Sequence, residues 1–515
     1  MIGRDLLPRT FGPFLGRFGR LNEVQEASVG PILAGQSVVI AAPTASGKTE
    51  AALAPLVERH CPPGVDGLRI VYVVPTRALV NDLVRRIEGP LQTLRVSFAA
   101  KTGDIPAFKI TERPAVLLTT PESLDSLLCR RPALFTTVTA VVLDEVHLVD
   151  GTYRGDQLQV LLRRLPAAQH VVLSATIGAP EALAQRYAGP EAVVIRVGES
   201  RPIELEIHER LEDVVAALRK SGRIKVLWFC NKRADVETVS QELRAFWPKD
   251  RIVTHHGSLA RKDRTDTEAA LRYWTWGICV ATMTLEVGID VGDVDAVVLQ
   301  GPPNTVSAFL QRIGRGGRRE ASIAAFGLCL EEGDAASFEF LAEAATEGRI
   351  EVTEAEPDPS VAVQQILSLL YGSPRGLDRE RLASLLEPLV GQATLALILD
   401  HLATQEYVVL ARTRVQAGTK TMDMGEKGRL HSNIPSQKET VLRDARTGKA
   451  IGAAFLGASI GDTVIVGGKT RRVVGMSGTT VDLEAVSGAG GVASFKKRKS
   501  GGAFRWLLPD TLRGT

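Results

Sequence analysis

The stretch Ala42 to Thr49, APTASGKT, has the residue types and spacing of a loop that binds phosphate groups. The apolar run 37–42 precedes it and a helical pattern begins at Thr49, so the loop joins a buried strand to a helix. Backbone N–H groups at the start of a helix attract anions, Lys48 can reach the β- and γ-phosphates, and the Thr49 hydroxyl can bind Mg²⁺. Ala42 replaces the usual first glycine, so the match is imperfect. We predict that ATP and Mg²⁺ bind to Thr44, Ala45, Ser46, Gly47, Lys48 and Thr49.

A second pattern with chemical meaning is the acidic pair Asp144-Glu145, which directly follows the apolar strand 140–143. Asp144 is predicted to hold Mg²⁺ opposite Thr49, and Glu145 to polarise the water that attacks the γ-phosphate. A surface turn would be the alternative, but a position after a buried strand favours the catalytic interpretation. Upstream of the loop, Gln25 could pair with the adenine edge through its amide or simply cap a helix.

Polar residues also end the other predicted strands of the first 197 residues. Ligands of open parallel sheets bind beyond the carboxyl ends of the strands, and hydroxyls with an arginine there suit a nucleic-acid backbone. Ser174 and Thr176, after strand 170–173, are expected to sense the nucleotide site. The predicted backbone contacts are Pro75, Thr76, Arg77, Thr120, Pro121 and Glu122.

The βα rhythm restarts with predicted strands at 224–230, 252–258 and 278–282, but no second phosphate loop follows. Four arginines instead occur in the eight residues 312–319, where clustering is costly unless anions neutralise them. A plain basic patch is the alternative to arginines that reach a nucleotide, among which Arg315 and Arg318 are the candidates. The pair His255-His256 lacks a third metal ligand at suitable spacing, which favours a backbone or nucleic-acid contact.

These motifs resemble those of superfamily 2 helicases over residues 20–330: the phosphate loop, DEVH and SAT resemble motifs I, II and III, and Gln25, PTRAL and TTPES resemble motifs Q, Ia and Ib. The segments TLEVGIDVGDVD and QRIGRGG resemble motifs V and VI. The resemblance implies that Thr282 faces the nucleic-acid backbone, Asp290 the ribose, and Arg315 with Arg318 the γ-phosphate. It also implies that Gln311 couples ATP hydrolysis to the nucleic acid.

The sequences of motifs V and VI, with Arg154-Gly155 after DEVH, are similar to those of the large helicase-related (Lhr) group. The Ski-like group is a more distant relative. Arg318 stands where Lhr-type chains often carry histidine. The resemblance implies an ATP-dependent DNA helicase or translocase of 3′ to 5′ polarity, serving repair or genome defence, with a nuclease or repair protein as a possible partner. An RNA helicase, or a remodelling ATPase that does not separate strands, are the alternatives.

The carboxyl-terminal third begins after an acidic linker, in which residues 331–360 carry ten Asp or Glu against Arg349 alone. Amphipathic patterns at 361–371, 377–388 and 392–404 and a strand at 407–410 predict a winged helix, which either binds duplex or braces the motor. Short strands follow from 441. Residues 411–515 hold 18 Lys or Arg against 8 Asp or Glu. A Gly-rich loop there is expected to contact phosphates through Lys496, Lys497, Arg498 and Lys499. A loop that is merely solvated is the alternative.

Composition sets the limits on this interpretation. A net charge of +3 over 515 residues means that nucleic-acid binding depends on local basic surfaces. Five scattered cysteines fit a reducing cytosol, and no signal peptide or membrane span is expected, so we predict a cytoplasmic monomer. The predicted fold is α/β: RecA-like parallel-sheet domains at 1–197 and 198–355, a winged helix at 356–412 and a basic β-rich domain at 413–515.

Overall fold

The computed structural model describes residues 2–43, 46–103, 113–165, 168–175, 178–197, 201–257, 259, 261–282, 285, 292–317, 322–350, 356–434, 440–454, 459–466, 469–477, 480–486, 491–492 and 502–513. Its contacts divide the chain into two compact units. One comprises residues 1–198, 352–436 and 499–515, and the other comprises 199–351 and 437–498. Each unit is built around a parallel sheet.

The sheet of the first unit has seven parallel strands in the order β3-β4-β2-β5-β6-β1-β7. Its central strands are β-branched apolar runs that are buried on both faces, as a parallel sheet covered by helices requires. The strands are β1 (Val38–Ala41), β2 (Ile70–Val73), β3 (Phe98–Lys101), β4 (Val116–Thr119), β5 (Ala140–Leu143), β6 (Gln169–Ser174) and β7 (Val193–Arg196). The prediction of a RecA-like parallel sheet is confirmed. The pattern missed β3 and β7, which are the half-buried edges; each is a short apolar run that ends in a charged residue, FAAK in β3 and VVIR in β7.

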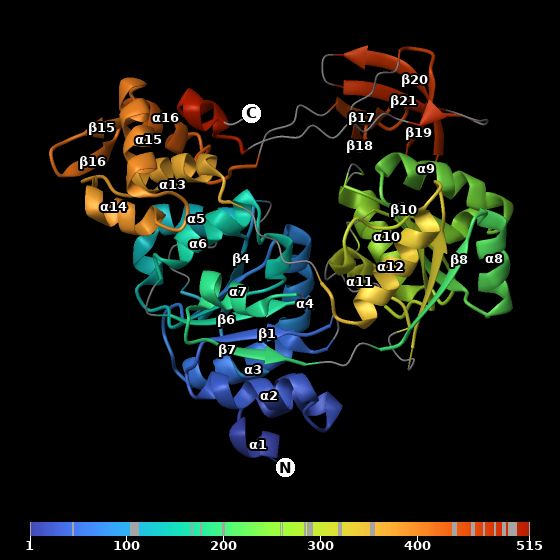
Figure 1. Ribbon diagram of the computed structural model, residues 1–515, viewed down its shortest axis with the longest axis horizontal. Coiled ribbons are helices and arrows are strands. Elements are labelled where there is room, and N and C mark those ends of the chain that lie inside the picture. Colours follow the sequence, from blue (N-terminus) through green and yellow to red (C-terminus); the bar gives the residue numbers. More distant parts are fainter. Residues whose placement is uncertain are drawn as a thin grey trace. The chain divides into compact units, whose positions relative to one another are not determined.

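Helices surround this sheet (Figure 1). They are α1 (Ile2–Leu6), α2 (Glu23–Leu33), α3 (Lys48–His60), α4 (Arg77–Thr93), α5 (Pro121–Arg130), α6 (Tyr153–Leu162) and α7 (Pro180–Leu183). Three of them, α3, α4 and α5, begin directly after strands of the sheet, which places their first turns at its carboxyl edge. The candidate site lies at this edge.

The second unit contains a six-stranded parallel sheet in the order β10-β11-β9-β12-β13-β8. Its strands are β8 (Ile203–His208), β9 (Lys225–Cys230), β10 (Ile252–His255), β11 (Gly277–Ala281), β12 (Ala296–Gln300) and β13 (Ile323–Leu328). Its helices are α8 (Leu211–Lys220), α9 (Arg233–Glu242), α10 (Arg261–Tyr273), α11 (Val306–Ile313) and α12 (Asp334–Thr346). The second predicted RecA-like domain is therefore confirmed.

A winged-helix arrangement follows in the first unit, where α13 packs against α5 and α6 (Figure 1). Its helices are α13 (Pro359–Tyr371), α14 (Arg379–Leu386), α15 (Gln392–Thr404) and α16 (Thr419–Glu426). Its antiparallel sheet has the order β14-β16-β15, formed by β14 (Leu377–Asp378), β15 (Val408–Leu410) and β16 (Arg414–Ala417). The predicted domain boundary at 412/413 falls between β15 and β16, inside this sheet.

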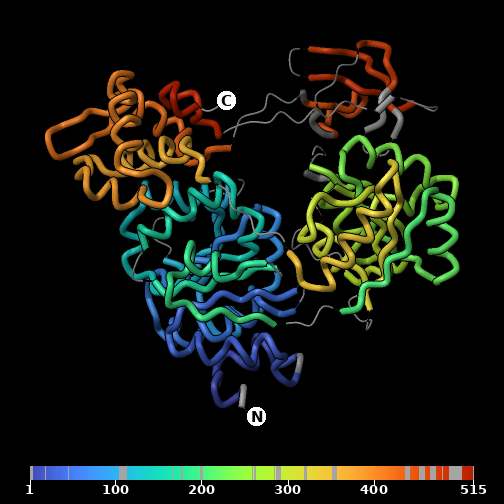
Figure 2. Tube along the Cα trace, in the orientation of Figure 1, coloured from blue at the N-terminus to red at the C-terminus, as the bar shows by residue number. Residues whose placement is uncertain are grey.

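The last turns of the chain return to the winged helix (Figure 2). Phe504, Leu507 and Leu508 are buried in the same apolar core as α13 and α15. These turns include the short 3₁₀ helices Arg505–Leu507 and Asp510–Leu512. The β-rich region is thus an insertion between residues 436 and 499. The sequence patterns did not predict that the chain returns to the winged helix after it.

The β-rich region forms a six-stranded mixed sheet in the order β18-β17-β21-β20-β19-β22 and belongs to the second unit. Its strands are β17 (Thr440–Asp444), β18 (Ala450–Ala454), β19 (Thr463–Val466), β20 (Lys469–Ser477), β21 (Thr480–Ala485) and β22 (Gly491–Val492). The predicted basic run 496–499 lies outside the described residues. Within the described ranges, every helix is too short or too polar to cross a membrane.

Candidate nucleotide site

The phosphate loop ends at Gly47, which precedes α3 and has a left-handed backbone with φ +80°. A Cβ atom at this position would lie 2.8 Å from Nε2 of Gln25 and 3.1 Å from Nδ2 of Asn22, so only glycine fits. Asn22 donates to the Ser46 carbonyl at 3.0 Å, and its backbone N–H donates to Oε1 of Gln25 at 3.0 Å. Gln25 therefore lies beside the loop and its amide oxygen caps α2, which is one of the two predicted alternatives, whereas a contact with adenine stays a prediction. The predicted loop residues Thr44 and Ala45 lie outside the described residues.

The lysine of the loop is held inside it. Nζ of Lys48 donates to the carbonyls of Ala42 at 2.7 Å and Pro43 at 2.8 Å, and the residue is 6% exposed. Thr49 is also buried and hydrogen-bonds Tyr72 of β2. An ammonium and a hydroxyl at the start of α3 match the donor and the metal ligand that the sequence predicts.

Asp144 follows β5 and is half-buried on the same edge. Its Oδ2 accepts the Tyr72 hydroxyl at 2.7 Å and its Oδ1 accepts the Glu145 N–H at 2.9 Å. Burial and the negative charge of Glu145 raise the pKa of Asp144 to about 6, although the Tyr72 hydrogen bond, Lys48 and Arg86 act in the other direction. The site thus carries more negative charge than its protein partners compensate, and this favours a bound cation.

Glu145 has an unusual backbone for a residue with a side chain, with φ 48° and ψ 42°. Such left-handed conformations cost about 1 kcal/mol or more and cluster at functional sites. Its Oε2 atom is buried and makes no hydrogen bond within the described part of the chain. The His147 ring lies beside this carboxylate, with its Nδ1 atom 3.6 Å from Oε2. A buried carboxylate oxygen with spare acceptor capacity is suited to orient a water molecule.

His147 connects this loop to the end of β6. Its Nδ1 accepts the Ala175 N–H at 3.2 Å and lies 3.2 Å from the Ser174 hydroxyl. Because Nδ1 accepts the amide proton, the approach to Glu145 is a close contact and not a charged hydrogen bond. Ser174, predicted to couple nucleotide and nucleic acid, is thus two contacts from Glu145, whereas Thr176 lies outside the described residues.

The predicted nucleic-acid residues of the first unit lie at the same edge of the sheet. Thr76 caps α4 by accepting the Leu79 N–H at 3.3 Å, and Thr120 precedes α5 with its hydroxyl 3.3 Å from that of Ser123. Pro121 is buried in the first turn of α5, and Arg77 begins α4. Glu122 is paired with Arg154, a contact that the sequence did not predict.

In the second unit, Thr282 directly follows β11, is 5% exposed and donates its N–H to the His255 carbonyl at 3.1 Å. Gln311 lies in α11 and is mostly buried, and Arg315 follows this helix and is 2% exposed. The predicted Asp290 and Arg318 lie outside the described residues. The roles of these residues stay predictions.

The two neighbouring histidines have carboxylate partners, and the predicted nucleic-acid contact stays a prediction. His256 contacts Glu237 at 2.7 Å, with both side chains buried, and His255 contacts Glu268 at 3.3 Å. Both partners lie on helices that pack beside β10. A signal for these pairs was absent from the sequence because the glutamates are remote from the histidines along the chain.

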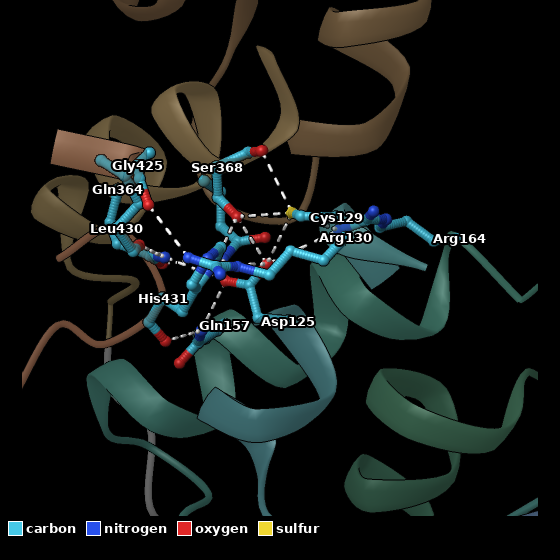
Figure 3. Close-up of polar contacts among 11 residues, drawn as sticks. Asp125, Cys129, Arg130, Gln157, Arg164, Gln364, Ser368, Gly425, Leu430 and His431 are labelled. Carbon is cyan, nitrogen blue, oxygen red and sulfur yellow. Dashed lines mark hydrogen bonds and ion pairs between the residues drawn. The ribbon is translucent and has the colours of Figure 1, made fainter. Parts of the chain in front are cut away.

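A further buried polar cluster joins α5 and α6 to the winged helix (Figure 3). Oδ2 of Asp125 accepts amide N–H groups at 2.8–3.0 Å, and Oδ1 accepts the Ser368 hydroxyl at 2.6 Å. His431 and Arg164 lie 3.9 and 3.5 Å from Oδ1. Burial alone would raise the pKa of Asp125, but these groups lower it to about 2. Burial alone would lower the pKa of His431, but its contacts with Asp125 and Cys129 raise it to about 9. The three amides belong to Gln157, Gln364 and Gln365.

This cluster, which we call the Asp125 hub, brings together three side chains of metal-ligating type, Asp125, Cys129 and His431. The fit to a metal is poor, because Arg164 lies 3.5 Å from the carboxylate and 3.8 Å from the Cys129 sulfur. The carboxylate is also already saturated with donors. The hub is therefore a structural junction, whereas Thr49 and Asp144 offer the oxygen donors and the excess negative charge that suit Mg²⁺.

Two parts of the chain match known protein families. Residues 22–183 match the model of the DEAD/DEAH box helicase family, and residues 208–320 match the helicase conserved C-terminal domain. The chain is 27% identical to the ATP-dependent helicase Lhr-Core of Methanothermobacter thermautotrophicus, over 92% of this chain and 63% of that protein. It is 30% identical to Lhr-Core protein 2 of Thermococcus barophilus, over 69% of this chain and 47% of that protein. It thus spans about half to two thirds of the length of these relatives.

Two solved structures share the fold. The Mycobacterium smegmatis helicase Lhr bound to single-stranded DNA and AMP-PNP aligns with a TM-score of 0.73 at 24% identity, over 83% of this chain and 62% of that chain. The DUF1998 helicase MrfA bound to DNA aligns with a TM-score of 0.76 at 19% identity, over 94% and 74%. At these identities the likeness concerns the fold.

Proposed function

Because the chain belongs to the superfamily 2 helicases of the DEAD/DEAH-box type and is similar to their Lhr group, we propose that it is an ATP-dependent DNA helicase or translocase. The observation that carries this proposal is the pair Asp144 and Glu145, packed at the sheet edge with the phosphate loop. Relatives named as Lhr helicases, and Lhr and MrfA structures that contain DNA, support DNA as the substrate. We further propose 3′ to 5′ movement and a role in repair or genome defence.

The chemistry follows from the geometry of the first unit. Lys48 exchanges its bonds to the loop carbonyls for bonds to the β- and γ-phosphates, which carry the full charge that the carbonyls lack. Glu145 orients the attacking water with its spare Oε2 and takes up its proton. Tyr72 holds Asp144 in place through their 2.7 Å hydrogen bond.

Thr49 and Asp144 are the residues that would hold Mg²⁺. When bound, the ion supplies positive charge that draws electron density from the γ-phosphate. The raised pKa of Asp144 supports this assignment, since a cation would relieve the repulsion between the two neighbouring carboxylates. Arg315 and Arg318 are proposed to neutralise charge on the γ-phosphate, Asp290 to contact the ribose, and Gln311 to couple hydrolysis to the nucleic acid.

The test is ATPase activity across a panel of single-stranded DNA, single-stranded RNA and tailed duplexes, followed by strand displacement on the duplex that stimulates most. We expect DNA to stimulate hydrolysis and a 3′ tail to be required for displacement. Stronger stimulation by RNA than by DNA would identify RNA as the substrate. Stimulation without displacement would instead identify a remodelling ATPase.

A further inference from the structure

Arg154, the second residue of α6, connects the loops that end two different strands of the first sheet. Its Nε and Nη2 atoms donate to the two carboxylate oxygens of Glu122 at 2.6 and 3.1 Å, and Nη2 also donates to the Pro75 carbonyl at 2.6 Å. Pro75 follows β2, and Glu122 lies in the first turn of α5 after β4. One planar guanidinium therefore sets the spacing between the two loops that are proposed to grip the nucleic-acid backbone.

The same arginine neutralises a charge that would otherwise oppose nucleic-acid binding. Both oxygens of Glu122 are engaged by Arg154, and the two side chains are only 18% and 19% exposed. A lone carboxylate at this edge would repel a phosphate, whereas the paired carboxylate has a compensating charge within hydrogen-bond distance. Glu122 thus acts as an anchor for Arg154 more than as a direct contact to the backbone.

Arg154 is also tied to the loop that carries Glu145. The Leu148 N–H donates to the Glu145 carbonyl at 3.0 Å, the Thr152 N–H donates to the Val149 carbonyl at 3.0 Å, and the Thr152 hydroxyl accepts the Arg154 N–H at 3.2 Å. The segment between Glu145 and Arg154 is therefore a continuous series of turns.

Close packing supports this connection. A Cβ atom at Gly155 would overlap the Val149 carbonyl oxygen, so α6 is pressed against the loop as closely as glycine permits. The space lined by Pro75, Pro121, Asp144 and Val149 has a volume of about 10 Å³, hardly enough for one water molecule. The three strand ends thus form one packed block.

We propose that Arg154 is the positioning residue that passes changes at the DEVH loop to both nucleic-acid loops, so that they move as a single grip. This inference rests on the proposed function, because it requires that nucleic acid stimulates hydrolysis. It assigns to Arg154 no contact with ATP. The role requires a planar guanidinium that donates to Glu122 and Pro75 at the same time from its place on α6. A lysine keeps the charge but cannot make this pair of contacts.

The experiment measures ATPase rates of wild type, Arg154→Lys and Glu122→Gln over a titration of single-stranded oligo-dT. We expect Arg154→Lys to lower the stimulated kcat about tenfold, a usual size for coupling between two sites, and to raise the half-stimulating DNA concentration. Glu122→Gln is expected to have a smaller effect, and the double variant to be no worse than Arg154→Lys alone, since both remove the same pair.

The matched control is Arg196→Lys, which alters an exposed arginine that also forms two bonds to one carboxylate, that of Glu181. It should retain wild-type stimulation. Wild-type stimulation in Arg154→Lys would overturn the inference, as would an equal loss of nucleotide affinity and thermal stability, which would indicate a structural role alone. If no nucleic acid stimulates the wild type, the proposed function itself is wrong and the inference with it.

Discussion

The first unit contains two aspartates with opposite electrostatic surroundings, Asp125, which is fully buried, and Asp144, which is half-buried. Asp125 accepts hydrogen bonds from three amides and one hydroxyl and lies near two cationic side chains, and its pKa falls to about 2. Asp144 accepts one hydroxyl and one backbone N–H and stands beside the acidic Glu145, and its pKa rises to about 6. The protein completes the surroundings of Asp125 and leaves those of Asp144 incomplete.

This difference separates a structural acid from a functional one. A buried carboxylate that the fold fully satisfies contributes to holding its neighbours together, because breaking such a pair exposes unpaired charge. A buried carboxylate with a raised pKa stores repulsion that a ligand can relieve. The predictions below use substitutions and pH to reverse or enlarge this difference, beginning with the largest expected effect.

Glu145→Gln should lower kcat for ATP hydrolysis about 10²- to 10⁴-fold, the usual range for a lost general base. Nucleotide binding should persist, because Lys48, Thr49 and Asp144 are unchanged. Single-turnover hydrolysis and a nucleotide titration measure the two effects separately. The exposed Glu181 provides a control, and Glu181→Gln should hydrolyse ATP at the wild-type rate. Near-normal hydrolysis by Glu145→Gln would remove Glu145 from the mechanism.

Asp125→Asn should lower the free energy of unfolding by about 3–5 kcal/mol, because it leaves His431 and Arg164 buried without their counter-charge. Asp144→Asn should instead leave stability unchanged or increase it, since it removes repulsion with Glu145. Urea unfolding of the two variants is the measurement. If both variants lose stability equally, the two aspartates are not electrostatically distinct.

The alkaline stability of the Asp125 hub should depend on His431. Its pKa rises from 6.5 to about 9 in the folded chain, so its contribution is fully present below pH 6.5 and is lost as the pH rises through 9. The total should be up to about 3 kcal/mol. Urea midpoints between pH 6 and 10 measure it, and His431→Gln should flatten this part of the profile. If the urea midpoint of the variant depends on pH as strongly as that of the wild type, a group other than His431 causes the pH dependence.

Much of the nucleotide site could be predicted from the sequence, because its residues follow apolar strands in local motifs. Lys48, Asp144 and Glu145 lie in such motifs, and the parallel sheet brings their strand ends to one edge. The edge strands β3 and β7 were not predicted; each is a half-buried run of three apolar residues that ends in a charged residue.

The Asp125 hub and the Arg154 bridge could not be predicted from spacing. Asp125 and His431 are more than 300 positions apart in the chain, and neither lies in a local motif. Their contact depends on how α13 packs on α5 and α6. In the sequence, Arg154 stands out only through the resemblance of the Arg154-Gly155 pair to the Lhr group. Its link to Pro75 and Glu122 depends on three strand ends that the fold places together.

Nucleotide binding in the presence of Mg²⁺ should weaken at acid pH because of Asp144. With a pKa of about 6, its carboxyl is ionised above that pH and protonated below it, and a proton competes with a cation for the same oxygens. Affinity should therefore fall about tenfold for each pH unit below 6. Fluorescent-nucleotide titration between pH 5 and 8 measures this, with a titration lacking Mg²⁺ as the control. Equal slopes with and without the ion would exclude Asp144 as its ligand.

Tyr72→Phe should give the smallest change and the sharpest test of what sets the pKa of Asp144. The Tyr72 hydroxyl stabilises the ionised carboxylate, so its removal should raise the pKa of Asp144 further and move the acid limb of Mg²⁺-dependent binding upward. A lost hydrogen bond of about 1.4 kcal/mol corresponds to about one pH unit. Tyr187→Phe is the matched control, because it removes another buried phenol that donates to an aspartate, Asp150, at 2.9 Å. The acid limb should move in the first variant and stay in place in the second. If it moves in neither, the negative charge of Glu145 and burial alone set the pKa of Asp144.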